Sequence, residues 1–120
     1  MEKIIFIVDD NDANLVMAGS ALEDEYRVLT MPSAQKMFSL LEKKTPELIL
    51  LDIEMPDMTG LEAIVKLKEN PKWQNIPVLF ITGRHDDKLK SDPNISKAVD
   101  IVYKPIVAPV LKAAVKKYIN

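Results

Sequence analysis

Cysteine is absent from the 120 residues of the chain, and histidine occurs once, as His85. The absence of cysteine excludes disulfide bonds, thiolate nucleophiles and zinc sites built on thiolates. With a single imidazole available, a metal ion would have to be held mainly by oxygen ligands, which favours Mg²⁺, Ca²⁺ or Mn²⁺. The candidate metal ligands are therefore the acidic residues.

Long apolar runs and an excess of positive charge are also missing. The apolar runs have only a few residues, too short for a membrane span, and acidic residues follow the first of them too soon for a signal peptide. The net charge is -2 at pH 7, so the chain lacks the basic field that nucleic acid or an anionic membrane attracts. We therefore expect a cytoplasmic protein that binds neither nucleic acid nor membranes directly.

What the sequence does contain is a regular alternation of two kinds of segment. Short β-branched runs predict buried strands, and longer segments with apolar residues three and four positions apart predict helices. Because parallel strands need crossover connections, the alternation predicts a single α/β domain, residues 1–120, with a doubly wound five-stranded parallel sheet and helices on both faces. The expected strands are residues 4–8, 26–30, 47–53, 76–82 and 98–103, and the expected helices are residues 13–25, 33–44, 59–70 and 107–119.

The expected helices carry signals at their ends. Thr59 and Glu62 have the spacing of a capping box. Lys43 and Lys44 occupy the expected last turn of the second helix, where the helix dipole favours them. Pro93 falls where a fourth helix is expected, which predicts a short or broken helix there. The apolar face of the last expected helix consists of Val107, Val110, Leu111, Ala114, Val115 and Tyr118.

Polar side chains stand at the carboxyl ends of four of the five expected strands. Asp9 and Asp10 follow the first strand, and Asp52 lies near the end of the third. Thr82 ends the fourth strand and Lys104 follows the fifth. In a 2-1-3-4-5 sheet the strand order reverses between strands one and three, and ligands bind outside the carboxyl ends at that point. Each of these residues alone has an ordinary explanation, such as a helix cap or a surface lysine, but the five together predict one site.

The charges of this group indicate the kind of ligand. Two carboxylates about 4 Å apart repel by ~4 kcal/mol at an effective dielectric constant near 20, so three acids require a proton or a cation. One divalent ion and the Lys104 ammonium would cancel three negative charges, and Mg²⁺ leaves a position for a phosphoryl oxygen. Asp52 can then attack phosphorus and form an acyl phosphate, while Thr82 and Lys104 offer partners for phosphoryl oxygens. The main-chain carbonyl of Glu54, in the turn after Asp52, is a further candidate metal ligand.

Four blocks of sequence carry a likeness to a known family. They are IVDDN (7–11), LILLDIEMPDMTGLE (48–62), IPVLFITG (76–83) and YKP (103–105), and together they span almost the whole chain. With these blocks the chain resembles the receiver domain of two-component response regulators, and the block around Asp52 is specific for that family. The resemblance implies a flavodoxin-like fold with strand order 2-1-3-4-5 and Mg²⁺ as the cofactor.

The resemblance also implies a role for each acidic residue of the site. Asp52 matches the phosphoacceptor of the family. Asp10 matches the acid that binds Mg²⁺ directly together with Asp52, and Asp9 matches the acid that supports the metal indirectly, often through water. Glu54 matches the position whose main-chain carbonyl joins the metal shell.

The remaining matches concern the phosphoryl group and the partners. Thr82 matches the hydroxyl that turns toward the phosphoryl group, Lys104 the lysine that pairs with it, and Lys104-Pro105 a peptide bond that is cis in the family. The implied function is transfer of a phosphoryl group from the phosphohistidine of a histidine kinase or phosphotransfer protein to Asp52, which switches the surface around strands four and five. A downstream effector or an attached output domain would read that change. Such a domain catalyses only its own phosphorylation and slow dephosphorylation, so we do not expect a turnover enzyme.

Three positions depart from the pattern of the family. Ile101 stands three residues before Lys104, where an aromatic switch residue is usual, and Tyr103 lies next to the lysine instead. Lys97 stands where the family usually has glycine. Pro93 interrupts the fourth helix, which is part of the surface that receivers commonly use for output.

Other functions remain open at this level. A degenerate receiver that acts as a phosphorylation-independent interaction module would account for Ile101 and Pro93. A small Mg²⁺-dependent phosphohydrolase would use Asp52 as nucleophile and Glu54 as acid or base, but the sequence has no cap segment to form a substrate pocket. A flavin- or nucleotide-binding module is disfavoured, because the acidic segment DDNDANL after the first strand would repel phosphate.

Overall fold

Five strands alternate with helices along the chain, as the pattern of apolar residues predicts. The computed structural model describes residues 2–119. The strands are β1 (Ile4–Val8), β2 (Arg27–Met31), β3 (Leu48–Asp52), β4 (Val78–Thr82) and β5 (Asp100–Tyr103). The helices are α1 (Asp12–Leu22), α2 (Ala34–Leu41), α3 (Gly60–Glu69), α4 (Asp87–Lys90), the 3₁₀ turn η1 (Ile95–Lys97) and α5 (Ala108–Lys116).

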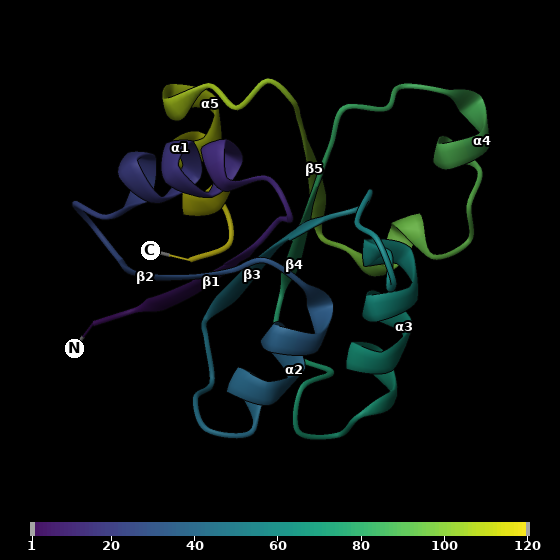
Figure 1. The fold of residues 1–120 in the computed structure, drawn as a ribbon, viewed down its shortest axis with the longest axis horizontal. Helices are drawn as coiled ribbons and strands as arrows, with labels where there is room; N and C mark the ends of the chain where they lie inside the picture. The colour runs from purple at the N-terminus through teal and green to yellow at the C-terminus, as the bar shows by residue number, and fades with distance from the viewer. Residues whose placement is uncertain (1, 120) are drawn as a thin grey trace.

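The sheet has the predicted topology. Its order is β2-β1-β3-β4-β5, and all neighbouring pairs are parallel. Figure 1 shows α1 and α5 on one face of the sheet and α2 and α3 on the other. The strand order reverses between β1 and β3, so the carboxyl ends of these two strands flank the point at which ligands bind in such sheets. The doubly wound, flavodoxin-like fold is thus confirmed.

Alternate residues of the central strands face two separate apolar layers. Phe6 and Val8 of β1 pack in the layer that α2 and α3 cover, whereas Ile5 and Ile7 pack against α1 and α5. This period of two follows from the geometry of an extended chain. Because both faces of the sheet are covered, every residue of β3 and β4 is buried. The edge strand β2 keeps exposed positions, as its more polar sequence predicts.

The capping box at the start of α3 is present as predicted. The hydroxyl oxygen of Thr59 accepts a hydrogen bond from the N–H of Glu62 (3.2 Å), and the Glu62 carboxylate accepts one from the N–H of Thr59 (3.0 Å). These two bonds satisfy N–H groups that have no partner within the helix. The start of α3, which lies beside Asp52, is therefore well defined.

Helices α1, α2 and α5 end earlier than the sequence pattern predicts, and the turns after α1 and α2 show how these two helices stop. After α1, the N–H of Tyr26 donates to the carbonyl of Leu22 in a turn that leads into β2. After α2, the N–H groups of Lys43 and Lys44 both donate to the carbonyl of Leu40. These lysines therefore lie beyond the helix, and the expectation that they occupy its last turn is wrong.

The segment between β4 and β5 contains little helix, as the position of Pro93 predicts. Helix α4 has only four residues, and the carboxylate of its N-cap, Asp86, accepts a hydrogen bond from the N–H of Leu89 (3.2 Å). The side chain of Leu89 is buried in the layer beneath α2 and α3. Figure 1 shows α4 at the margin of the molecule, joined to β5 through η1.

The last helix buries a narrower face than expected. Leu111, Ala114 and Val115 of α5 are buried, at the i, i+3 and i+4 spacing of one helix face. Val107 precedes the helix as its N-cap, and Val107 and Val110 are about half exposed, so the expectation that they share this face is wrong. Within residues 2–119, none of the helices combines the length and apolar character that crossing a bilayer requires.

Candidate functional site

The buried polar residues of the described chain meet at one place. Within residues 2–119 they are Asp9, Asp52 and Thr82, each with no solvent exposure, and they stand at the carboxyl ends of β1, β3 and β4. Burying charged groups is unfavourable unless they are paired or bind an ion, so their accumulation at one edge of an otherwise apolar sheet marks a functional site.

Asp9 and Asp10 are adjacent but lie in different environments. The N–H of Asp9 donates to the carbonyl of Met31, which continues the pairing of β1 with β2 by one residue and holds Asp9 inside. Its Oδ1 accepts a hydrogen bond from the N–H of Asn11 (2.9 Å). Asn11 in turn caps α1 by accepting from the N–H of Asn14 (3.0 Å). Asp10 is exposed, so the strand end supplies one buried and one accessible carboxylate.

Asp52 is the last residue of β3, and its carboxylate has partners from two segments. Its Oδ1 accepts a hydrogen bond from the N–H of Glu54 (3.3 Å) and lies 3.2 Å from the Nζ of Lys104. The loop after Asp52 is pinned by a hydrogen bond from the N–H of Gly60 to the carbonyl of Ile53 (2.9 Å).

Gly60 is a site residue that sequence reasoning did not identify. A Cβ atom at this position would lie 2.4 Å from the main-chain oxygen of Asp52 and 2.9 Å from the Cα of Ile53, both of them backbone atoms. Only glycine allows the start of α3 to approach the end of β3 so closely. The one available signal was a glycine directly after the capping Thr59.

Lys104 lies between the two buried carboxylates. Its Nζ is 3.4 Å from Oδ2 of Asp9 and 3.2 Å from Oδ1 of Asp52. Burial alone would lower the pKa of the Lys104 ammonium, but the Asp52 and Asp9 carboxylates outweigh this and raise it. The Lys104-Pro105 peptide bond is cis, as the resemblance implies.

One lysine does not neutralise the site. Burial, followed by repulsion from Asp9, raises the pKa of Asp52 to about 7, although the Lys104 ammonium acts in the opposite direction. The second oxygens of Asp9 and Asp52 are buried, and no protein group within residues 2–119 donates a hydrogen bond to them. Buried carboxylate oxygens without hydrogen-bond donors are unfavourable, so positive charge in addition to that of Lys104 would stabilise the site.

The carboxylates are placed to share a cation. Asp9, Asp10 and Asp52 each offer a carboxylate oxygen, and these oxygens lie within 4.8 Å of one another. An all-oxygen donor set of this kind suits Mg²⁺, which commonly takes one or two carboxylates and retains waters. The residues therefore fit a divalent metal ion.

The side chain of Glu54 has a partner that the sequence did not predict. The hydroxyl of Thr82 donates to its carboxylate, with distances of 2.8 Å to Oε1 and 3.0 Å to Oε2. The same hydroxyl oxygen accepts from the N–H of Arg84 (3.0 Å). The receiver resemblance implies a role only for the main-chain carbonyl of Glu54, whereas its carboxylate also joins the site through Thr82.

The aromatic residues near the site are arranged around Tyr103. The ring of His85 stacks on that of Tyr103, with centroids 4.3 Å apart and an interplanar angle of 16°. Tyr103 is 37% exposed, whereas Ile101 is partly buried against the layer beneath α2 and α3. The aromatic group beside Lys104 therefore lies at the surface.

Comparison with known proteins assigns this arrangement to a family. The model of the response regulator receiver domain matches residues 5–116. A probable cyclic di-GMP phosphodiesterase of Vibrio cholerae serotype O1 is 36% identical over 116 residues, which cover 97% of this chain and 26% of that protein. The chain thus spans about a quarter of the length of this relative.

Solved structures of low identity share the fold. A chemotaxis protein of Vibrio cholerae superposes with a TM-score of 0.91 at 22% identity, covering 99% of this chain and 100% of that one. The receiver domain of a Pseudomonas aeruginosa sensor histidine kinase superposes with a TM-score of 0.88 at 18% identity over 98% of each chain, and its structure holds magnesium in the active-site cleft. With the family match over residues 5–116 and the agreement in strand order, this chain belongs to the response regulator receiver family of two-component systems.

Proposed function

We propose that Asp52 of this domain accepts a phosphoryl group from the phosphohistidine of a histidine kinase or phosphotransfer protein, with Mg²⁺ as the cofactor. The observation that carries the proposal is a pair of buried carboxylate oxygens, on Asp9 and Asp52 beside the Lys104 ammonium, to which no protein group in the described chain donates a hydrogen bond. This arrangement is unfavourable in the free protein and becomes favourable when a cation and a phosphoryl group enter.

The proposed metal ligands are those that the family pattern implies. Asp10 and Asp52 would hold Mg²⁺ directly together with the main-chain carbonyl of Glu54, and Asp9 would support it indirectly. When bound, the ion supplies positive charge that offsets the charge on the phosphoryl oxygens. The exposure of Asp10 and the burial of Asp9 agree with this division of roles.

The transfer step uses Asp52 as a nucleophile. An oxygen of its ionised carboxylate attacks phosphorus, an O–P bond forms, and the P–N bond of the phosphohistidine breaks. The electron pair of that bond remains on the imidazole nitrogen of the donor. Lys104, 3.2 Å from Asp52 in the free protein, then faces the new phosphoryl oxygens as a fixed cation.

The consequence of phosphorylation is a change at the carboxyl ends of β4 and β5. The phosphoryl group adds up to about two negative charges next to Lys104 and offers acceptors to the hydroxyl of Thr82. We propose that residues 1–120 act as one receiver domain, cytoplasmic and without turnover activity of its own, whose surface around β4 and β5 is read by an effector or an attached output domain.

The geometry favours this function over a phosphohydrolase. In a phosphohydrolase the carboxylate of Glu54 would act as acid or base toward a substrate on Asp52. In the structure that carboxylate is held by the hydroxyl of Thr82 instead. Turnover of common phosphate esters at enzyme-like rates would nevertheless favour the phosphohydrolase.

The test is Mg²⁺-dependent formation of an adduct on Asp52. The protein is incubated with Mg²⁺ and a small phosphodonor, and its intact mass is measured beside that of Asp52→Asn and of a sample in chelator. We expect the mass of one phosphoryl group in the wild-type sample with Mg²⁺, and loss of at least about 10³-fold in rate in the variant, because an amide is a far weaker nucleophile. An adduct that persists in Asp52→Asn, or none in any sample, contradicts the proposal.

A further inference from the structure

The hydroxyl of Thr82 is committed to Glu54 in this structure. Thr82 has no solvent exposure, and its Oγ1 lies 2.8 and 3.0 Å from the two carboxylate oxygens of Glu54. The lone pairs of Oγ1 face the N–H of Arg84 at 3.0 Å. The threonine side chain is thus held in one orientation by a donor on one side and an acceptor on the other.

A hydroxyl has one proton to donate. While that proton is directed at Glu54, it is not available to a phosphoryl oxygen on Asp52. A hydrogen bond to a carboxylate is charge-assisted and roughly twice as strong as one between neutral groups, so giving it up carries a free-energy cost. Glu54 and a phosphoryl group on Asp52 therefore compete for the same donor.

We propose that the Glu54 carboxylate is a latch that restrains Thr82 in the unphosphorylated state. On phosphorylation of Asp52, the Thr82 hydroxyl transfers its hydrogen bond from Glu54 to the phosphoryl group. Glu54 is in this sense a positioning residue, because it acts on the phosphoryl group through Thr82. This inference rests on the proposed function and adds to it a residue that sets how readily the domain enters its phosphorylated conformation.

The latch also joins two loops that lead away from the site. Glu54 belongs to the loop after β3, whereas Arg84 follows β4. The guanidinium of Arg84 makes two hydrogen bonds, both 2.9 Å, to the carboxylate of Asp86, which caps α4. Movement of Thr82 out of the latch therefore disturbs the segment that starts α4.

The test is a double-mutant cycle read by binding of a phosphoryl mimic. Beryllium fluoride is titrated with saturating Mg²⁺ into wild type, Glu54→Ala, Thr82→Ala and the double variant. Glu54→Ala keeps the main-chain carbonyl and removes the competing acceptor, so we expect binding about tenfold tighter than in wild type, because a larger fraction of the protein is competent. In the Thr82→Ala background the same change should have almost no effect, because no hydroxyl remains to be released.

Two matched variants separate the latch from general charge effects. Asp57→Asn removes one negative charge from the same loop at an exposed position with φ 68°, a conformation that asparagine tolerates, and should leave the affinity unchanged. Glu54→Gln retains an oxygen that can accept from Thr82 and should fall between wild type and Glu54→Ala. The γ-methyl resonance of Thr82, one of four threonines, should move in Glu54→Ala toward its position in the beryllium fluoride complex.

The possible outcomes distinguish the latch from the function on which it rests. Equal affinity in wild type and Glu54→Ala overturns the latch. An equal gain in the Thr82→Ala background also overturns it, because direct repulsion between Glu54 and the ligand would then be the cause. Absence of Mg²⁺-dependent beryllium fluoride binding in all four proteins, with folding verified by circular dichroism, overturns the proposed function itself.

Discussion

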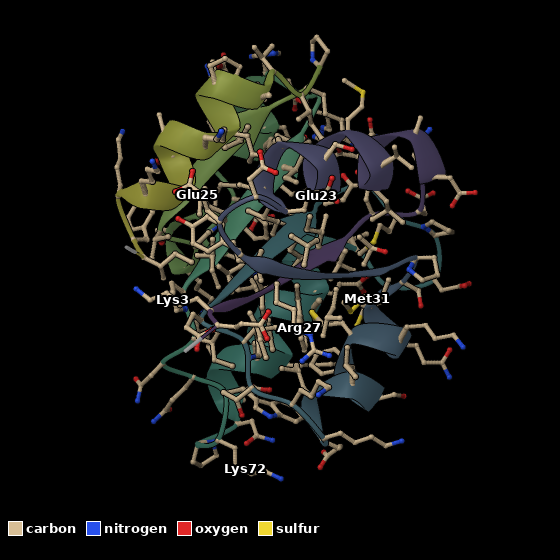
Figure 2. All side chains as sticks on the ribbon, turned by 90° about the vertical axis from the view of Figure 1, so that its left-hand side faces the viewer. Lys3, Glu23, Glu25, Arg27, Met31 and Lys72 are labelled. Carbon is tan, nitrogen blue, oxygen red and sulfur yellow. The ribbon has the colours of Figure 1, made fainter. Side chains whose placement is uncertain are left out.

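At the amino end of the sheet, polar side chains close turns and pair with one another, whereas at the carboxyl end two buried carboxylates share a single lysine. In Figure 2, Lys3 and Arg27 mark the amino ends of β1 and β2, and Met31 marks the carboxyl end of β2. Near the amino end, the Nζ of Lys68 donates to two main-chain carbonyls in the loop between α3 and β4, each at 3.0 Å. At the other end, the second oxygen of each site carboxylate, Asp9 and Asp52, is buried and accepts no hydrogen bond from the residues that the structure describes.

The same contrast holds for residues that join the helices to the sheet. The hydroxyl of Tyr118, after α5, lies 3.1 Å from both the carbonyl of Val99 and the carboxylate of Asp100 at the start of β5. Glu25 pairs with Lys116 at 3.3 Å, and Figure 2 shows it beside α5. One amino-end hydroxyl, that of Tyr26, is buried and has no hydrogen-bond partner among residues 2–119. Burial raises its pKa, however, so it carries no charge at neutral pH.

The difference indicates that the two ends serve different purposes. Satisfied polar groups at the amino end contribute to stability. The buried carboxylates at the carboxyl end lower the stability of the free protein, and under the proposed function they are retained for binding a cation and a phosphoryl group. Substitutions at the two ends should therefore separate stability from function.

The largest combined effect on stability and Mg²⁺ binding is expected for Gly60→Ala. The new Cβ would meet main-chain atoms of Asp52 and Ile53, which cannot move independently of the site. We expect a loss of about 3 kcal/mol in the free energy of unfolding, and weaker Mg²⁺ binding, because relief of the clash displaces Asp52. Denaturant titration and Mg²⁺ titration measure the two effects.

Gly19→Ala is the matched control for this substitution. A Cβ at Gly19, inside α1, would lie 3.8 Å from Cγ1 of Val28, an ordinary contact. This change should stabilise the protein by roughly 0.5–1 kcal/mol through helix propensity and leave Mg²⁺ binding unaltered. Equal behaviour of the two alanine variants would show that the close approach at Gly60 has no consequence.

The second prediction concerns stability alone and is a dependence on pH that belongs to Asp52. In chelator, folded Asp52 keeps its proton up to a pKa of about 7, while the unfolded chain releases it near the ordinary value of 3.8. The folded state binds more protons between these values, so the free energy of unfolding falls as the pH rises from about 4 to about 7, by at most about 1.4 kcal/mol per pH unit.

Urea titrations at several pH values, with Asp52→Asn beside wild type, measure this contribution as the difference between the two proteins. In saturating Mg²⁺ the sign should reverse, because the metal binds the ionised carboxylates and stabilises the folded state more at higher pH. Identical pH profiles for wild type and Asp52→Asn in chelator would show that Asp52 does not titrate in this range.

The smallest effect is expected at the amino end, for Lys68→Met. The change removes two hydrogen bonds to the loop carbonyls and should cost about 1 kcal/mol of stability without altering beryllium fluoride binding. Trp73 lies in this loop, with its ring centroid 5.6 Å from that of Phe38. Its fluorescence therefore reports whether the loop becomes more mobile when the Lys68 hydrogen bonds are lost. Lys66→Met, at an exposed position of α3, is the control and should change neither property. A loss of beryllium fluoride affinity in Lys68→Met would mean that contacts at the amino end of the sheet influence ligand binding at the carboxyl end.

Much of the fold was predictable from local patterns in the sequence. The ends of the strands lie within two residues of their predicted positions, and the capping box of Thr59 and Glu62 is present. The effect of Pro93 on the fourth helix was also predictable, because proline cannot donate a helical hydrogen bond. The ends of α1 and α2 were not, because the charged residues that follow each helix (23–25 and 42–44) include no proline or glycine that would mark an end.

The site was predictable in composition but not in its internal contacts. Asp9, Asp10, Asp52 and Lys104 were expected to meet because the carboxyl ends of parallel strands share one edge of the sheet, and the structure brings them together. The hydrogen bond between Glu54 and Thr82 joins residues 28 positions apart, so no local pattern indicates it.

By itself, the sequence determined which residues would stand at the carboxyl edge of the sheet, because strand identity follows from local apolar patterns and the parallel direction follows from the alternation of strands with helices. Only the tertiary structure decided how those residues are used. It buries Asp9 and exposes Asp10, raises the pKa of Asp52, and directs the Thr82 hydroxyl to Glu54. Burial, electrostatic repulsion and hydrogen-bond geometry depend on distances between segments remote in the chain, and those distances exist only once the sheet has formed.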